Sequence, residues 1–162
     1  MERCVECGAQ TPSSTGPRHA YLPASAGCWA LFGEVQADEL NRFGYPPAHR
    51  LVVDTYGAQH PGDGKDRRAR QSVFVHLVGV CAVLERGADA KRATQALRRA
   101  LSGRPDFPVL ARVGGPGELT IVSLRGASDL DDYTTRATRW AHSVWASWAE
   151  YHPQIREWMD RR

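Results

Sequence analysis

Two cysteines near the start of the chain have the spacing of a metal-binding turn. Cys4 and Cys7 are separated by two residues and are followed by Gly8. One tight turn with this spacing presents two thiolates to one ion, and a glycine supplies the backbone freedom that such a turn needs. The pair is only half of a zinc signature, because a structural site needs four ligands. Two further ligands must therefore come from elsewhere in the chain.

The stretch from Cys28 to His60 supplies these ligands if it folds as two helices. Apolar residues recur at helical spacing in residues 28–43 and again in residues 48–60, and the Gly-Tyr-Pro-Pro sequence of residues 44–47 separates them. A short connection makes two helices antiparallel neighbours, so the first residue of one lies beside the last residue of the other. We therefore predict a closed, structural Zn²⁺ site with the ligands Cys4, Cys7, Cys28 and His60.

Each of these ligands also has a simpler interpretation. The Cys4–Cys7 pair could be a redox pair or two surface thiols. Cys28 could be a small apolar residue at the start of a helix, and His60 could be a cation favoured by the helix dipole. His19 competes with His60 as the fourth ligand, because it lies in the same irregular segment as the cysteine pair.

Three other polar residues lie on helices that should be buried: His49, Asp54 and His76. If the helices over residues 48–60 and 70–86 pack together, His76 meets the face that carries the other two. Such a group could perform acid–base catalysis or bind a second metal. A histidine in an apolar helix is more often a hydrogen-bonded core residue, and His49 lies at the opposite end of its helix from His60. Beyond these candidates the catalytic residues are unknown.

The elements that would position these residues are helical. Residues 1–27 are rich in Gly, Pro, Ser and Thr, and we expect an irregular arm that a metal ties down. Residues 28–162 form the body of one all-α domain of about five helices. The helix over residues 70–86 is apolar nearly all round and belongs at the centre of the fold, with Cys81 in the core. The other helices are expected over residues 28–43, 48–60 and 89–102, after an N-cap at Ser128, and around Ile155, while residues 119–124 are a helical turn or a short strand.

Aromatic and basic residues have structural explanations that compete with functional ones. Trp140, Trp145 and Trp148 could line an aromatic pocket, but their spacing suits packing against the central helix. Basic residues gather in residues 67–70 and 91–99. They form either a patch for phosphate-bearing partners or solvated helix faces.

Composition limits the function classes. The 162 residues suit one domain, and no run approaches the ~18 to 20 apolar residues that a membrane span needs. The polar N-terminus has no signal peptide, so we expect a cytoplasmic protein. A net charge of +3 is too small to predict nucleic-acid binding on its own. The sequence contains no phosphate-binding loop, dinucleotide fingerprint or His-Glu-x-x-His motif.

Several of these segments resemble one protein family. The segments are Cys4-Val-Glu-Cys7-Gly8, Gly27-Cys28-Trp29 and, most specifically, the run from Val53 to Pro61, Val-Asp-Thr-Tyr-Gly-Ala-Gln-His-Pro. They are similar to small bacterial proteins of the DUF5946 family, a domain of unknown function, and the resemblance covers nearly the whole chain. It implies no activity, cofactor or partner.

The sequence therefore favours a zinc-binding helical protein that acts by binding a protein partner or a small ligand. One alternative is a metal-dependent enzyme with a His/Asp site on the helices over residues 48–60 and 70–86. A further alternative is a nucleic-acid-binding regulator. The sequence leaves open whether the metal is structural or catalytic, what the ligand is, and how many copies associate.

Overall fold

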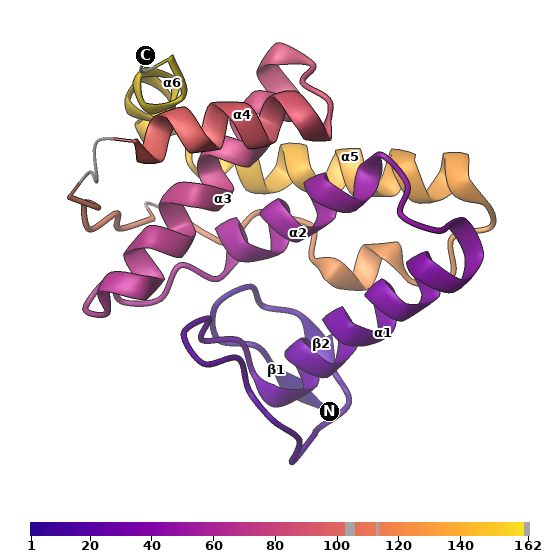
Figure 1. Ribbon diagram of the computed structural model, residues 1–162. Coiled ribbons are helices and arrows are strands. Elements are labelled where there is room, and N and C mark those ends of the chain that lie inside the picture. The colour runs from indigo at the N-terminus through magenta and orange to yellow at the C-terminus, as the bar shows by residue number, and fades with distance from the viewer. Residues whose placement is uncertain (103–105, 113, 161–162) are drawn as a thin grey trace.

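The computed structural model describes residues 1–102, 106–112 and 114–160. As predicted, the fold is all-helical apart from one small sheet (Figure 1). The predicted helices are all present, each within three residues of its expected start. In chain order the elements are β1 (Glu2–Arg3), β2 (Gln10–Thr11), α1 (Ala26–Phe43), α2 (Ala48–Gln59), α3 (Arg67–Arg86), α4 (Ala90–Leu101), the 3₁₀ helix η1 (Ile121–Leu124), α5 (Leu130–Ala146), the 3₁₀ helix η2 (Ala149–Tyr151) and α6 (His152–Asp160).

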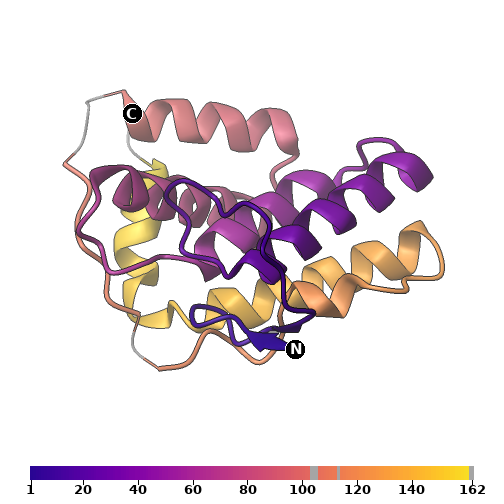
Figure 2. The same ribbon diagram turned by 90° about the horizontal axis from the view of Figure 1, so that it is seen from below.

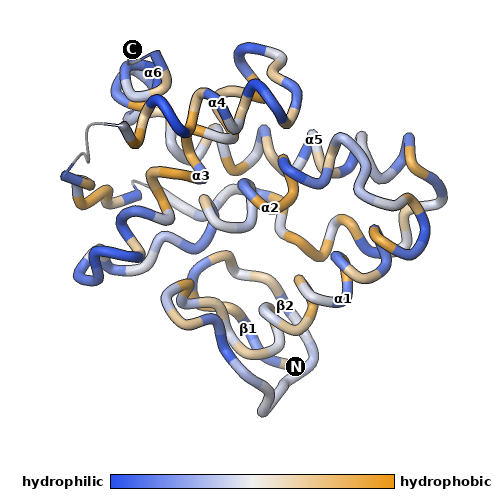
Figure 3. Tube along the Cα trace, in the orientation of Figure 1, coloured by the Kyte–Doolittle hydropathy of each residue, from blue (hydrophilic) through white to orange (hydrophobic). Residues whose placement is uncertain are grey.

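Helix α3 lies at the centre, as its all-round apolar sequence predicted. It contacts α2, α4, α5 and α6, and its apolar residues form an orange band in Figure 3. Phe74, Leu77, Val78 and Cys81 on this helix are all buried. Figures 1 and 2 together show α4 and α5 on opposite sides of the layer that α2 and α3 form.

Helix α2 is deeply buried along its second half. Every residue from position 54 to position 60 is buried, although several of them are polar. Helix α5 packs chiefly against α2, so the expectation that its tryptophans pack against the central helix was only partly correct. The indole N–H of Trp140 donates to Gln59 Oε1 at 3.0 Å, and that of Trp148 donates to the Ala58 carbonyl at 3.1 Å. These contacts fix the end of α2.

Local hydrogen bonds explain where the helices begin. Helix α1 starts two residues before the predicted position, because Ser25 caps it and accepts a hydrogen bond from the Cys28 N–H. The cap of α5 is Asp129 and not Ser128 as predicted, since the Asp129 side chain accepts from the Asp132 N–H. The undecided segment at residues 119–124 forms the 3₁₀ helix η1.

The arm, residues 1–27, is less irregular than predicted. Strands β1 and β2 pair antiparallel, with Glu2 opposite Thr11 and Arg3 opposite Gln10, and the last two residues of the arm begin α1. Figure 2 shows the arm in front of the layer that contains α2 and α3. Among the described residues, no helix combines the length and apolarity needed to cross a bilayer.

Candidate metal centre

The turn from Cys4 to Cys7 is closed by backbone hydrogen bonds. Gly8 N–H donates to the Cys4 carbonyl at 2.8 Å, and Cys4 N–H donates to the Ala9 carbonyl at 2.9 Å. Gly8 has a φ of 77°, in the left-handed region that favours glycine. The Ala9 N–H donates to Cys7 Sγ, with 3.5 Å between nitrogen and sulfur. The turn therefore holds both thiols on one side and supplies a dipole that favours a thiolate.

Cys28 enters the same space from the first turn of α1. The N-terminus of a helix carries partial positive charge, which stabilises a thiolate at this position. The preceding residue, Gly27, lets the arm approach closely: a Cβ there would lie 2.2 Å from the Pro12 carbonyl oxygen and 2.6 Å from Thr11 Oγ1. The Gly27 N–H also donates to a carboxylate oxygen of Glu2. These contacts hold the turn that carries Cys4 and Cys7 beside Cys28.

His60 closes the group from the end of α2. Its Nδ1 lies 2.7 Å from the Tyr56 carbonyl oxygen, so this nitrogen carries the proton and donates. The other ring nitrogen, Nε2, lies 3.6 Å from Cys4 Sγ and 3.5 Å from Cys28 Sγ. A backbone carbonyl bonded to one imidazole nitrogen is the usual way to aim the other at a metal.

The four side chains lie close enough together to surround one metal ion. Their sulfur and nitrogen atoms all lie within 4.8 Å of one another, and Cys7 Sγ and Cys28 Sγ are 3.7 Å apart. Bonds of about 2.3 Å to sulfur and about 2.0 Å to nitrogen give tetrahedral edges of about 3.8 Å between sulfurs and about 3.5 Å from sulfur to nitrogen. All three cysteines are free thiols. The cluster is thus able to hold a metal ion with protein ligands alone.

Electrostatics within the cluster also favours a cation. Hydrogen bonds from Cys28 and Cys7 lower the pKa of the Cys4 thiol, whereas the neighbouring Cys28 and Cys4 sulfurs and burial raise the pKa of Cys7. One sulfur therefore ionises readily, and a second negative charge beside it is opposed. Burial disfavours a charged His60, but its hydrogen bonds with Cys28 and Cys4 outweigh that effect and raise its pKa to about 9. A divalent ion would stabilise all three thiolates together.

Residues around the cluster complete its environment. The Tyr56 hydroxyl lies 3.5 Å from Cys28 Sγ. Arg112 donates to the Glu6 carbonyl at 2.8 Å and to the Gln59 carbonyl at 3.1 Å, so one guanidinium joins the cysteine turn to the end of α2. Arg112 could not be predicted from the sequence, because a contact to distant carbonyls leaves no motif.

His19, the competing ligand, lies outside the cluster. Its Nδ1 accepts hydrogen bonds from the Tyr21 N–H at 3.3 Å and the Leu22 N–H at 3.1 Å. Its ring packs edge-on against Tyr21 and Trp29 with centroid distances of 4.4 and 4.8 Å. Burial lowers the pKa of His19, and the nearby His76 adds to that effect. His19 therefore stabilises the fold of the arm.

The three weaker candidates do not form one site. His49 Nδ1 lies 2.9 Å from Glu39 Oε2, near the turn that joins α1 to α2. His76 Nδ1 lies 2.9 Å from Asp54 Oδ1, in the middle of the α2–α3 interface. The structure thus brings Asp54 and His76 together and leaves His49 apart. Within the described residues, the cluster at Cys4 is the one group of at least three such side chains with metal-site spacing.

A comparison with known protein families matches most of the chain but supplies no activity. A family model, DUF5946, described as a family of unknown function, matches residues 2–149. No curated protein and no solved structure matches the chain.

Proposed function

The chain belongs to DUF5946, a family of unknown function, and we propose that it is a zinc-dependent ligand-binding protein. In this proposal Cys4, Cys7, Cys28 and His60 hold a structural Zn²⁺ ion. The ion fastens the arm to the helical body, and the completed surface binds a small ligand or a protein partner.

The observation that carries the proposal is the agreement between the distances in the cluster and the edges of a zinc tetrahedron. The donor set supports zinc, because three thiolates and an imidazole suit Zn²⁺, whereas Mg²⁺ and Ca²⁺ prefer oxygen ligands. The burial supports a structural ion. Each of the four residues is at most 1% exposed, and four protein ligands leave no position for water or substrate.

The arm has few other means of staying folded. Its strands are two residues long, and the segment between β2 and α1 contains no regular helix or strand. Even so, the arm buries Ala9, Leu22 and Ala24 against the helical body. Binding of a metal to ligands from both parts converts metal affinity into folding free energy. The zinc would therefore hold the arm against the helical body.

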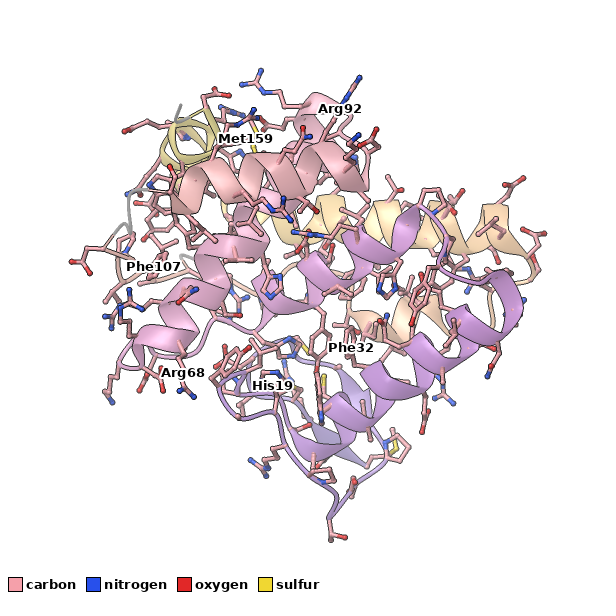
Figure 4. All side chains as sticks on the ribbon, in the orientation of Figure 1. His19, Phe32, Arg68, Arg92, Phe107 and Met159 are labelled. Atoms are coloured by element: carbon pink, nitrogen blue, oxygen red, sulfur yellow. The ribbon has the colours of Figure 1, made fainter. Side chains whose placement is uncertain are left out.

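A fastened arm would create a binding surface that the helical body alone lacks. Tyr21 of the arm and residues of α3 together line a cavity of about 450 Å³, which is large enough for a small molecule. The other two hypotheses gain no comparable support. His49 lies apart from Asp54 and His76, and the labelled basic residues Arg68 and Arg92 lie far apart in Figure 4.

Metal analysis of purified variants tests the proposal. We expect about one zinc per wild-type chain after mild chelation, and loss of most of it from Cys28→Ala and from His60→Ala, because each removes one ligand of the tetrahedron. Cys81→Ala is the matched control, since Cys81 is equally buried but lies in α3, outside the cluster.

The outcomes separate the possible ligand sets. Full zinc in both Cys28→Ala and His60→Ala would show that the proposed ligand set is wrong. If His60→Ala keeps its zinc while His19→Ala loses it, His19 is the fourth ligand. Far-ultraviolet circular dichroism on the same samples verifies that the helices remain folded.

A further inference from the structure

A hydrogen bond between a buried carboxylate and a histidine joins α2 to α3 away from the cysteine cluster. Asp54 is 1% exposed, and its two carboxylate oxygens have different partners: Arg50 Nε on its own helix, and His76 Nδ1 on α3 at 2.9 Å. A buried carboxylate with both oxygens engaged is fixed in position. It therefore fixes the orientation of the His76 ring.

Two glycines make room for this pair from opposite sides. A Cβ on Gly57 of α2 would lie 2.0 Å from the His76 ring, and a Cβ on Gly79 of α3 would lie 2.1 Å from Asp54 Oδ2. Each helix thus contributes one member of the pair and, three residues later, the glycine that admits the other member. Packing alone would not require this reciprocal arrangement, because apolar residues of ordinary size would fill the same interface.

The pair leaves one atom of His76 available. The Asp54 carboxylate can only accept, so His76 Nδ1 carries the proton in this hydrogen bond. Within the part of the chain that the structure describes, no hydrogen bond to His76 Nε2 occurs, and the side chain is 18% exposed. Nε2 is therefore free to meet a molecule that approaches from the cavity.

A second polar side chain, that of Ser72, belongs to the wall of the same cavity. Ser72 is 7% exposed, and no described group forms a hydrogen bond with its hydroxyl oxygen. Ser72 lies one helical turn before His76, and Arg68 lies one turn before Ser72, so all three share one face of α3. The Ser72 oxygen is itself buried, and a buried hydroxyl without a partner costs free energy. Rotation of the Ser72 side chain toward the cavity would let a ligand satisfy it.

We propose that this face of α3 is a binding site for a small molecule that carries an oxyanion group, a phosphate or a carboxylate. The cavity of about 450 Å³ is lined by Tyr21, Arg68, Gln71, Ser72, Val75 and His76.

Each lining residue has a distinct role toward such a ligand. The exposed guanidinium of Arg68 has no ion-pair partner among the described residues, and it attracts and orients the anion. The Ser72 hydroxyl and the Gln71 amide donate hydrogen bonds to its oxygens. His76 Nε2 donates when the ring is protonated and accepts a ligand hydroxyl when it is neutral. Val75 and the Tyr21 ring contact the apolar part of the ligand.

This inference rests on the proposed function in one respect, because Tyr21 reaches the cavity from the arm that zinc would fasten. The other polar residues that line the cavity all come from α3. Figure 4 shows Arg68 near the start of α3, on the side of the molecule where His19 of the arm lies. A failure of zinc binding and a failure of ligand binding are therefore distinguishable, provided that the zinc content of every sample is measured.

The test is a titration of the zinc-loaded protein with inorganic phosphate and, separately, with acetate at constant ionic strength. The readout is the ¹⁵N shift of the His76 ring, assigned by its loss in His76→Gln. We expect a saturable shift with at least one of the anions. Arg68→Gln should weaken binding about tenfold or more, because it removes a charged hydrogen bond. Ser72→Ala should weaken it about three- to tenfold.

Arg98→Gln is the matched control, because Arg98 is an exposed arginine on α4 outside the cavity. It should bind the anion as the wild type does. The site is refuted if neither anion shifts the His76 resonance up to high concentration, or if Arg68→Gln and Arg98→Gln bind equally well. If the wild type binds phosphate but contains no zinc, the oxyanion site stands and the structural metal does not.

Discussion

His49 lies in the first turn of α2 and His60 caps its C-terminal end. The two looked equivalent in the sequence, but their surroundings give them different chemistry. His60 is 1% exposed and directs Nε2 at two sulfurs, while its Nδ1 is held by the Tyr56 carbonyl. The His49 side chain is 31% exposed and pairs with the buried Glu39. Position along the helix decides the outcome, because only the end of α2 reaches the start of α1.

Removal of the Tyr56 hydroxyl tests how a hydrogen bond to a ligand sulfur affects the affinity for the metal. Tyr56 is buried, and its hydroxyl lies near Cys28 Sγ, to which it would donate once that sulfur is a thiolate. We expect Tyr56→Phe to keep one zinc but to bind it about 10- to 100-fold more weakly, as for other changes next to metal ligands. Competition with a chromophoric chelator measures this affinity.

Tyr133→Phe is the control for the loss of a buried tyrosine hydroxyl, because Tyr133 lies on α5, outside the cluster. Its zinc affinity should equal that of the wild type. An unchanged affinity in Tyr56→Phe would show that the hydroxyl does not act on the metal ligand.

At the residue scale the sequence predicted which cysteines and histidines approach one another. Residue type, the two-residue spacing and the turn between two helices were sufficient for that. The sequence could not predict Arg112 or the carboxylate of Glu2, because they contact backbone groups of segments that only the folded chain brings near. It also could not separate the Asp54–His76 pair from His49.

At the scale of elements, α1 and α2 position two of the four residues of the cluster. The helices run in opposite directions on either side of the turn at residues 44–47 (Figure 1). Side chains fill the space between them, and the rings of Phe32 and Tyr56 stack with centroids 4.1 Å apart. Their far ends therefore place Cys28 and His60 within reach of one ion.

The start of α1 must also be free of side chains where the arm crosses it. We expect Gly27→Ala to destabilise the protein by about 1 to 3 kcal/mol, because the new methyl group overlaps the arm backbone at Pro12. Urea unfolding monitored by circular dichroism measures the free energy, and limited proteolysis monitors release of the arm.

Gly33→Ala is the matched control on the same helix. A Cβ at Gly33 meets no atom within 4 Å, so alanine should leave the arm in place and stabilise α1 by up to about 1 kcal/mol. Equal stability of the two variants would show that the arm does not pack against Gly27 in solution.

The helices could be predicted from apolar periodicity, but which helices pack against one another could not. Helix α2 carries two polar residues, Thr55 and Gln59, that are both buried and hydrogen-bonded. The Thr55 hydroxyl donates to the Leu51 carbonyl at 2.7 Å, and the Gln59 amide donates to the carbonyls of Pro116 and Leu119 at 2.8 Å each. The partners of Gln59 come from a distant loop, so the sequence alone could not show how this buried amide is satisfied.

At the scale of the whole molecule, the chain consists of a helical body and an arm along one side, and the buried apolar residues of both belong to one hydrophobic core. The body packs around α3 through contacts with α2, α4, α5 and α6. The arm contacts the start of α1 and the end of α2, which are the two places that carry Cys28 and His60. Metal binding and arm docking are therefore the same event in the proposed function.

Removal of the metal should consequently affect the two parts differently. After strong chelation we expect fast amide hydrogen exchange in the first 25 residues, while α3 and α5 retain their protection. Helical circular dichroism should change little, because the arm contains two short strands and no complete helix. Hydrogen-exchange mass spectrometry with and without chelator measures this. Uniform loss of protection over all helices would mean instead that the metal supports the entire fold.

The most direct test of the central claim is X-ray absorption at the zinc edge of the purified wild-type protein. A closed site of Cys4, Cys7, Cys28 and His60 predicts three sulfur scatterers at about 2.3 Å and one imidazole nitrogen at about 2.0 Å, with four-coordinate geometry. A shell with fewer than three sulfurs, or with an added water oxygen, would contradict a structural Cys₃His centre and indicate an open, catalytic site.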